Sequence, residues 1–141
     1  VHRMGYDDQI VEELSLEEFT PAVGQGSVAI EVATILDSEI KNQLIQACNH
    51  QETSLKLRAE RAYLRVLEGG CSIPVFALAQ TEQDRLVLKG GIVSLDGAER
   101  ITLEVKGSLE NPESIGQELA EKVFAAGGKR ILDQIKSTLN S

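Results

Sequence analysis

The chain has 141 residues, about the length of one domain, and its 42% hydrophobic and 26% charged residues are typical of a soluble globular protein rather than a disordered one. Its 14 basic and 22 acidic residues give a net charge of −8, so phosphate backbones and anionic membrane surfaces would repel it, and neither nucleic acid nor membrane is expected as a partner. The longest apolar run, Ile73 to Ala79, is seven residues long and contains a proline, which excludes a membrane span of about 20 residues.

The cysteines and histidines do not predict a metal site. Cys48 and Cys71 form no C-x-x-C pair, and the two histidines form no H-x-x-x-H pair. Nothing points to an oxidising compartment, so we expect reduced thiols and a cytoplasmic protein. The first residues lack the apolar stretch of a secretion signal, and the chain starts with Val1 followed at once by periodic residues. We therefore expect it to be part of a longer protein.

The first part of the chain predicts one strand and one unusual turn. Residues 1–18 are expected to be a helix end and a loop, and the β-branched stretch Val28–Val32 predicts a strand. Before this strand, Pro21–Gly26 places glycines on both sides of Gln25. Glycine permits positive φ or the close approach of a ligand, and Gln25 offers a donor and an acceptor. The segment is either a tight turn, which is the commoner outcome, or a ligand contact.

Two helices are expected next. Asp37 or Ser38 can cap a helix that ends near Cys48, with apolar residues gathered on one side: Ile40, Leu44, Ile45 and Cys48. Cys48 is therefore expected to be a buried small hydrophobic residue. The second helix is expected from about Glu52 to Glu68, ended by Gly69-Gly70, with a core stripe at helical spacing: Leu55, Ala59, Ala62 and Val66.

The arginines of the second predicted helix lie outside its apolar stripe. Arg58, Arg61 and Arg65 recur at helical spacing on another face. The ordinary outcome for such a set is a solvated face paired with nearby acids, here Glu60 and Glu68. A substrate contact for Arg61 is the alternative.

The hydrophobic period then changes to that of strands. Ile73–Ala79 predicts a strand with Pro74 at its start or on an edge, and Thr81–Asp84 predicts a turn. Leu86–Leu95 predicts a second strand, interrupted by Gly90-Gly91. Asp96-Gly97 is a strong hairpin signal, and the next strand alternates apolar with polar residues: Ile101, Leu103 and Val105 against Thr102, Glu104 and Lys106. These strands predict an antiparallel meander.

Two helices close the chain. Asn111-Pro112-Glu113 is typical of a helix start, and Gly127-Gly128 ends this helix. The apolar stripe of the first helix is Ile115, Leu119 and Val123. That of the short last helix is Ile131, Leu132, Ile135 and Leu139. From residue 37 the order is therefore α-α-β-β-β-α-α, which predicts an α+β domain: a small three-stranded antiparallel sheet with helices packed on one face.

Cys71 is the residue that stands out chemically. It lies between Gly69-Gly70 and a strand start, where a thiol is expected to be accessible, whereas structural cysteines prefer cores. The preceding helix points its negative end at this position, and His50 is the only candidate base, so a cysteine hydrolase is not favoured. A thiol that reacts once with a strong electrophile and stays attached needs no such activation.

Three segments resemble motifs of the hydroxymethylbilane synthase (porphobilinogen deaminase) family. Residues 67–74 match its L-E-G-G-C-x-x-P signature, residues 21–26 its P-A-V-G-Q-G segment and residues 59–62 its A-E-R-A helix. The three occur in the family's order and at close to its spacing. On these motifs the chain is identified as a member, and the resemblance covers essentially all of the chain but only the C-terminal part of the family.

The resemblance implies a domain division and a reaction. Residues 1–36 would be a remnant of the preceding α/β domains, namely the end of domain 2 and the strand returning to domain 1, and residues 37–141 would be the C-terminal domain. Family enzymes condense four porphobilinogen molecules, with release of ammonia, into linear hydroxymethylbilane in haem biosynthesis. The growing polypyrrole chain is primed on a dipyrromethane cofactor, which the resemblance places on Cys71 through a thioether. It also implies that Val23, Gln25, Gly26 and Ser72 contact the pyrroles.

The resemblance also implies what this chain lacks. The family's catalytic aspartate and the arginines that hold substrate carboxylates lie in the N-terminal domains, so we expect no synthase activity from this chain alone and no catalytic acid within it. Cofactor loading of the isolated chain is not implied. Residues 1–36 are expected to be poorly ordered or to pair with another chain, and a fragment is expected to self-associate although the family is usually monomeric. The alternative is a non-catalytic α+β interaction module derived from the enzyme.

Overall fold

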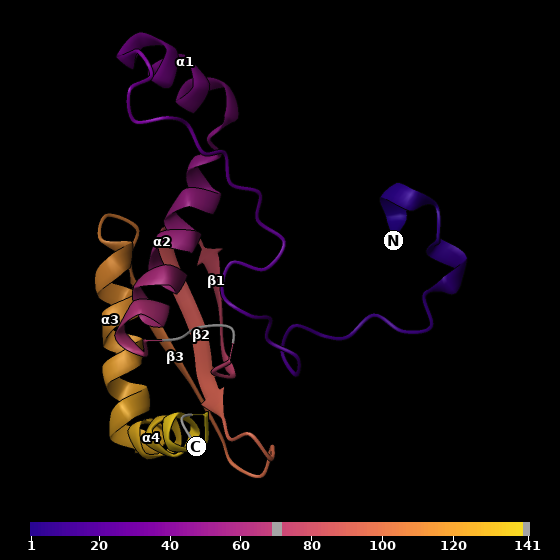
Figure 1. Ribbon diagram of the computed structural model, residues 1–141, viewed down its shortest axis with the longest axis vertical. Coiled ribbons are helices and arrows are strands. Elements are labelled where there is room, and N and C mark those ends of the chain that lie inside the picture. The colour runs from indigo at the N-terminus through magenta and orange to yellow at the C-terminus, as the bar shows by residue number, and fades with distance from the viewer. Residues whose placement is uncertain (69–71, 140–141) are drawn as a thin grey trace.

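The computed structural model describes residues 1–68 and 72–139. From residue 38 onward the order is two helices, three strands and two helices (Figure 1), as predicted: α1 Ser38–Cys48, α2 Gln51–Val66, β1 Val75–Glu82, β2 Arg85–Val93, β3 Arg100–Ser108, α3 Pro112–Val123 and α4 Lys129–Leu139. Two short 3-10 turns, His2–Met4 and Asp7–Gln9, precede them, and a π-helical turn, η3 Phe124–Gly128, joins α3 to α4. The predicted α+β class is confirmed.

The three strands form one antiparallel sheet in the order β1-β2-β3. The first hairpin turns at Gln83-Asp84, and the second turns through Gly97. Gly97 has a φ of 73°, which glycine adopts readily because it has no Cβ, and its N–H donates to the carbonyl of Ser94 at 2.9 Å. Contrary to expectation, Gly90-Gly91 do not interrupt β2. A Cβ on Gly91 would lie 1.8 Å from the carbonyl oxygen of Ile101, so the missing side chain lets β2 and β3 pair closely.

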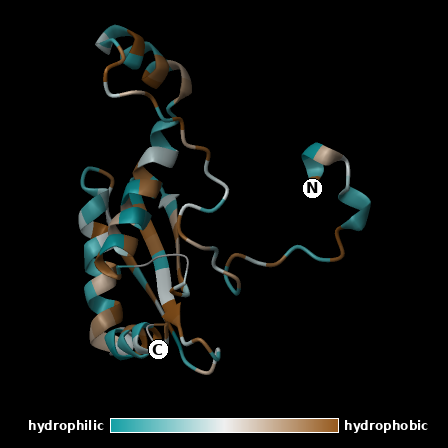
Figure 2. Cartoon of the chain, in the orientation of Figure 1, coloured by the Kyte–Doolittle hydropathy of each residue, from teal (hydrophilic) through white to brown (hydrophobic). Residues whose placement is uncertain are grey.

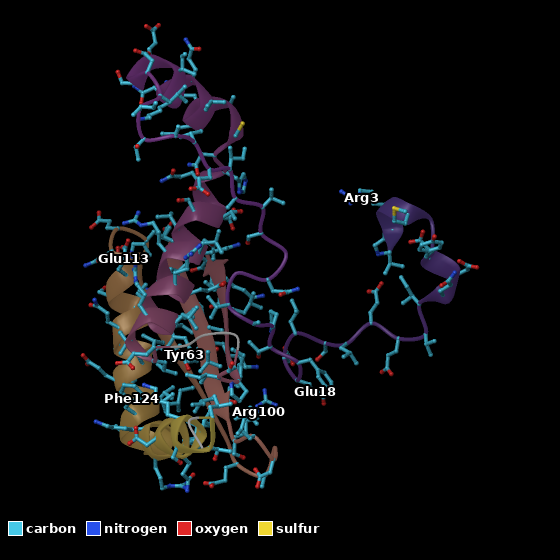
Figure 3. The ribbon with its side chains drawn as sticks, viewed as in Figure 1. Arg3, Glu18, Tyr63, Arg100, Glu113 and Phe124 are labelled. Carbon is cyan, nitrogen blue, oxygen red and sulfur yellow. The ribbon has the colours of Figure 1, made fainter. Side chains whose placement is uncertain are left out.

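Helices α2 and α3 cover one face of the sheet and lie side by side along it (Figure 1). The core contains the inward residues of the strands together with residues of α2, α3 and α4, and the largest fully buried side chains include Tyr63, Leu67, Leu86, Leu88, Ile92, Leu119 and Ile131. The Tyr63 hydroxyl donates to the carbonyl of Gly91 at 2.8 Å, and burial raises the pKa of Tyr63, which keeps the hydroxyl neutral. Figure 3 shows Tyr63 between α2 and the strands.

The helix boundaries follow local chemistry. The Asp37 carboxylate accepts the N–H of Glu39 at 2.8 Å and caps α1, and the Asn111 side chain accepts the N–H of Ser114 at 3.4 Å and caps α3. Both starts agree with the prediction. Helix α2 ends at Val66. The connection from α3 to α4 turns at Gly127, where φ is 104°.

Two predictions for the N-terminal part are wrong. No residue of α1 is buried, and Cys48 is exposed rather than part of a core. Val28–Val32 is irregular, with Val28 92% exposed, because no described strand lies beside it as a hydrogen-bond partner. Figure 2 shows apolar residues in α1 and in the chain leading to it as well as in the sheet. The apolar pattern is therefore real, but within the described residues α1 and this segment have no core to join.

Side chains of β2 and β3 hold the chain at residues 17 and 18. The Lys89 ammonium donates to the carbonyl of Glu17 at 2.6 Å, and the Arg100 guanidinium donates to the carbonyl of Glu18 at 3.2 Å (Figure 3). Arg100 also lies over the ring of Phe76, 5.0 Å from its centroid. The Lys89 and Arg100 contacts hold the chain next to the sheet just before it reaches the edge of β1 at Pro21.

Candidate functional site

The Pro21–Gly26 segment forms a tight turn whose glycines are required by its backbone. Gly24 and Gly26 have φ values of 71° and 79°, which side chains rarely adopt. The N–H of Gln25 donates to the carbonyl of Ala22 at 3.1 Å, and the N–H of Ser27 donates to that of Gly24 at 3.2 Å. The turn, hereafter the Gln25 turn (residues 21–26), exposes Gln25 and Gly26 to solvent.

The Gln25 turn is attached to the free edge of β1 and to α2. The carbonyl of Pro21 accepts the N–H of Ala77 at 3.2 Å, and Val23 packs against the core. The Glu60 carboxylate accepts the N–H of Gly24 at Oε2 and the N–H of Ala79 at Oε1, both at 2.8 Å. One side chain of α2 thus joins the turn to the strand.

Glu60 is 5% exposed and is the buried charged residue of the described chain. Burial raises its pKa, while the two backbone N–H donors and the positive charge of Lys56 oppose that rise. A raised pKa means that the folded protein gains most from this group when it is neutral. That contribution is lost as the pH rises through the raised pKa. The ionised carboxylate is therefore held at a cost in stability.

A hollow of about 260 Å³ lies beside the turn. Its lining combines polar side chains of the turn, α2 and β1 with apolar ones, and the polar members include Gln25, Thr53, Lys56, Glu60 and Gln80. Lys56 is paired with Glu52 at 2.6 Å. The side-chain amide of Gln25 makes no hydrogen bond within the part of the chain that the structure describes, so it is available to a ligand.

Cys71 and the preceding Gly69-Gly70 lie outside the described residues, but the segments on either side are well anchored. Leu67 is fully buried, and Glu68 takes a positive φ of 50° and pairs with Lys136 of α4. After the gap, Ser72 is exposed, and the carbonyl of Pro74 accepts the N–H of Val93 at 3.0 Å. The segment containing Cys71 therefore connects the end of α2 to the beginning of β1.

The arginines of α2 do not pair as expected. Arg58 forms a bidentate pair with Glu113 of α3, at 2.6 and 2.9 Å, instead of pairing within its own helix. Glu60 instead accepts the backbone N–H groups of Gly24 and Ala79, and Glu68 pairs with Lys136 of α4. Arg61 has no ion pair within the described residues and lines a separate groove of about 460 Å³ beside α1.

The structure brings some predicted site residues together and leaves others apart. Val23, Gln25 and Gly26 share one turn. Gln25 lines the hollow, whereas Val23, Gly26 and Ser72 are not among its lining residues. Sequence reasoning missed Lys56 and Glu60 as neighbours of Gln25. The burial of Glu60 could have been predicted from its position on the buried face of α2, next to Ala59 and three residues before Tyr63.

Neither a metal centre nor a membrane helix is found in the described ranges. Among residues 1–68 and 72–139, no three His, Cys, Asp or Glu residues gather as metal ligands. None of the helices described is both long and apolar enough to cross a membrane.

Comparison with known proteins places the chain in one family. Residues 54–125 match the family model of the porphobilinogen deaminase C-terminal domain. The porphobilinogen deaminase of Cytophaga hutchinsonii is 49% identical over 140 residues, which cover 99% of this chain and 45% of that protein. The enzymes of Carboxydothermus hydrogenoformans and Desulfosudis oleivorans are 43% and 46% identical, over 99% and 96% of this chain and 44% of each relative. The chain spans less than half the length of these curated relatives, and it belongs to the porphobilinogen deaminase family.

Proposed function

We propose that this chain is the C-terminal part of a hydroxymethylbilane synthase (porphobilinogen deaminase), a transferase that condenses four porphobilinogen molecules into linear hydroxymethylbilane. The observation that carries the proposal is the position of the Gln25 turn. It is docked on β1, the strand that the Cys71 segment enters, and it presents a side-chain amide without a partner in the described chain. The family's glycine–glutamine turn thus lies on the strand that follows its signature cysteine in the sequence.

In this proposal Cys71 is the anchor of a dipyrromethane primer. The thiol sulfur forms a C–S bond to the methylene carbon of a porphobilinogen-derived unit, the C–N bond to the amino group breaks, and the thiol proton leaves with the amine as ammonia. When bound, the primer supplies the terminal pyrrole carbon to which further porphobilinogen is added.

The other proposed site residues hold the pyrroles. Gln25 offers a hydrogen-bond donor and an acceptor, which suit a pyrrole N–H and a carboxylate of the substrate. Val23, Gly26 and Ser72 are proposed to lie near the pyrroles, although they are not among the residues that line the hollow. Gln25 and Ser72 are both exposed to solvent, which fits this role.

The proposal includes the parts of the enzyme that this chain does not supply. Residues 1–36 are proposed to belong to the preceding domains and residues 37–141 to the C-terminal domain, and the catalytic acid and carboxylate-binding arginines are proposed to come from the N-terminal domains. The isolated chain is expected to have no synthase activity, and measurable turnover by it would contradict this. A cytoplasmic location is proposed from the cysteine usage.

The experiment is an intact-mass measurement under denaturing conditions, after the chain has been combined with the N-terminal domains and given porphobilinogen. The wild-type chain is expected to gain the mass of two condensed pyrrole units, and Cys71→Ser is expected to gain nothing. Cys48→Ser is the matched control, because it removes the other thiol, which is exposed on α1. An unmodified wild-type chain, or an adduct that persists in Cys71→Ser, would overturn the assignment of Cys71.

The alternative, a non-catalytic interaction module, has less support. Each relative named above is a porphobilinogen deaminase.

A further inference from the structure

Glu60 is a buried carboxylate that binds two separate segments of the chain. A buried carboxylate is costly unless its oxygens are satisfied, and here each oxygen accepts one backbone N–H from a different segment. The two donors, on Gly24 and Ala79, are 36 residues before and 19 residues after Glu60 in the sequence. The side chain therefore connects an irregular segment to an ordered sheet edge.

The hydrogen bond from the Ala79 N–H to Glu60 does not by itself explain why the acceptor is a charged side chain. Ala79 lies in β1, which the ladder to β2 already holds at Leu88. The Gln25 turn has far fewer restraints: the Pro21–Ala77 bond, the packing of Val23 and the Gly24–Glu60 bond. Because a hydrogen bond to an ionised acceptor is stronger than one to a neutral acceptor, the charge of Glu60 matters most to the turn.

We infer that Glu60 is a positioning residue, whose ionised carboxylate holds the Gln25 turn against β1 and so fixes Gln25 at the hollow. The role rests on the proposed function, since it is the pyrrole contact of Gln25 that is positioned. Glu60 itself faces inward, with both oxygens engaged, and does not need to touch substrate. Lys56, four residues earlier on α2, is the charged group that acts on Glu60, whereas the neighbours from the turn and β1, Gln25 and Gln80, are neutral.

Glu60→Gln separates positioning from stability. The amide is close in shape and removes the buried charge, so global stability is expected to be kept or raised. Its nitrogen is a donor, however, and cannot accept a second N–H, so one of the two bonds is lost. The loss is expected at the less restrained turn.

The measurement is amide hydrogen exchange in the full 141-residue chain, followed residue by residue. In Glu60→Gln the amides of Gly24, Gln25 and Ser27 are expected to exchange about tenfold faster or more, the factor expected for losing one hydrogen bond to a charged group. The amide of Leu88 is expected to exchange at the wild-type rate. Unchanged exchange in the turn, or an equal acceleration throughout the sheet, would overturn the positioning role.

Glu113→Gln is the matched control. It makes the same chemical change on α3, where Glu113 pairs with Arg58, and it touches neither the turn nor β1. It is expected to leave the exchange of Gly24 unchanged. Faster exchange of Gly24 in this control would also count against a specific role of Glu60.

A titration of the wild-type chain keeps the inference testable if Glu60→Gln does not fold. The amide proton shifts of Gly24 and Ala79 are expected to move with the carboxyl carbon of Glu60, at one shared midpoint above the ordinary pKa of glutamate. A Gly24 amide that does not follow Glu60 would overturn the inference.

Activity of the complete enzyme distinguishes the two proposals. With Glu60→Gln the primer mass on Cys71 is expected to persist while condensation slows about tenfold or more, in proportion to the lost hydrogen bond. Unchanged condensation would overturn the positioning role. A wild-type enzyme that carries no adduct on Cys71 would overturn the proposed function but would leave the exchange result intact.

Discussion

Residues 28–48 and the described residues from 51 to 139 both carry apolar patterns that predict strands or helices, but only the second region is packed into a core. The hydrophobic core runs from Ala59 to Ile135, and no described residue before α2 is buried. Val28 and Ile30 are 92% and 62% exposed, although the β-branched residues of Val28–Val32 predict a strand. The two regions differ in burial because the second contains a sheet and helices that cover each other, whereas the first has no such packing partner among the described residues.

The comparison separates two kinds of sequence signal. A cap such as Asp37 needs only the next few residues, so α1 begins where expected although nothing buries it. An apolar stripe indicates which side of an element favours burial, but the covering surface can lie anywhere in the protein. In longer relatives, of which this chain spans less than half, that surface is expected to come from the rest of the chain.

The largest effect is expected from removing a core side chain. Leu119 of α3 is fully buried, so Leu119→Ala is expected to lower the free energy of unfolding by about 2–5 kcal/mol through lost burial and a cavity. Chemical denaturation measures the change. Ile45→Ala on α1, where the side chain is 58% exposed, is the control and is expected to cost less than about 0.5 kcal/mol. Equal losses would show that α1 is packed in solution.

A smaller loss is expected at the contact between α2 and α3. A Cβ on Gly116 would lie 2.2 Å from the carbonyl oxygen of Ala59 and 2.7 Å from the N of Tyr63, so the helices must separate in Gly116→Ala. Overpacking of this kind costs about 1–3 kcal/mol in free energy of unfolding. Gln117→Ala, one residue later and exposed, is the control. A Gly116→Ala chain as stable as wild type would contradict the close helix contact.

The next effect concerns one buried hydrogen bond. Tyr63→Phe keeps the ring but removes the hydroxyl that donates to the carbonyl of Gly91 at 2.8 Å. We expect a loss of about 0.5–1.5 kcal/mol in free energy of unfolding, the ordinary net value of such a bond. Tyr6→Phe in the exposed N-terminal segment is expected to change nothing measurable. If both variants behave alike, Tyr63 does not connect α2 to the sheet.

Most of the fold could be predicted because its signals are local. Asn111-Pro112, Asp96-Gly97 and the alternation of β3 each fix an element from neighbouring residues. The continuous β2 was missed because the glycines that usually break a strand are here required by the approach of Ile101. Whether an element is paired or covered depends on distant residues, so the strand at 28–32 and the burial of Cys48 were predicted wrongly.

The candidate site was predictable in part for the same reason. Gln25 and its glycines stand out in a short motif, and the turn they form is local. Glu60 was expected to pair with arginines of its own helix. Its actual partners, Gly24 and Ala79, come from two other segments, which the periodicity of α2 cannot reveal. The role of Cys71 comes from the family motif and stays a prediction.

The smallest effect compares two arginines on α2. Arg58 reaches Glu113 across the contact of α2 and α3, whereas Arg61 lines the groove beside α1 and has no ion pair in the described chain. The Arg58 hydrogen bonds lower the pKa of Glu113 below its ordinary value. This pair therefore stabilises the fold above the ordinary glutamate pKa, and the gain is lost as the pH falls through the lowered pKa.

Arg58→Gln is accordingly expected to be less stable than wild type at neutral pH, by less than any change above. The difference should shrink in acid and in high salt, because the pair is exposed. Arg61→Gln is expected to match wild type in stability throughout. Thermal unfolding at several pH values and salt concentrations tests both. A loss in Arg61→Gln equal to that in Arg58→Gln would mean that the groove beside α1 is closed in solution, and that the two regions of the chain are less different than their burial indicates.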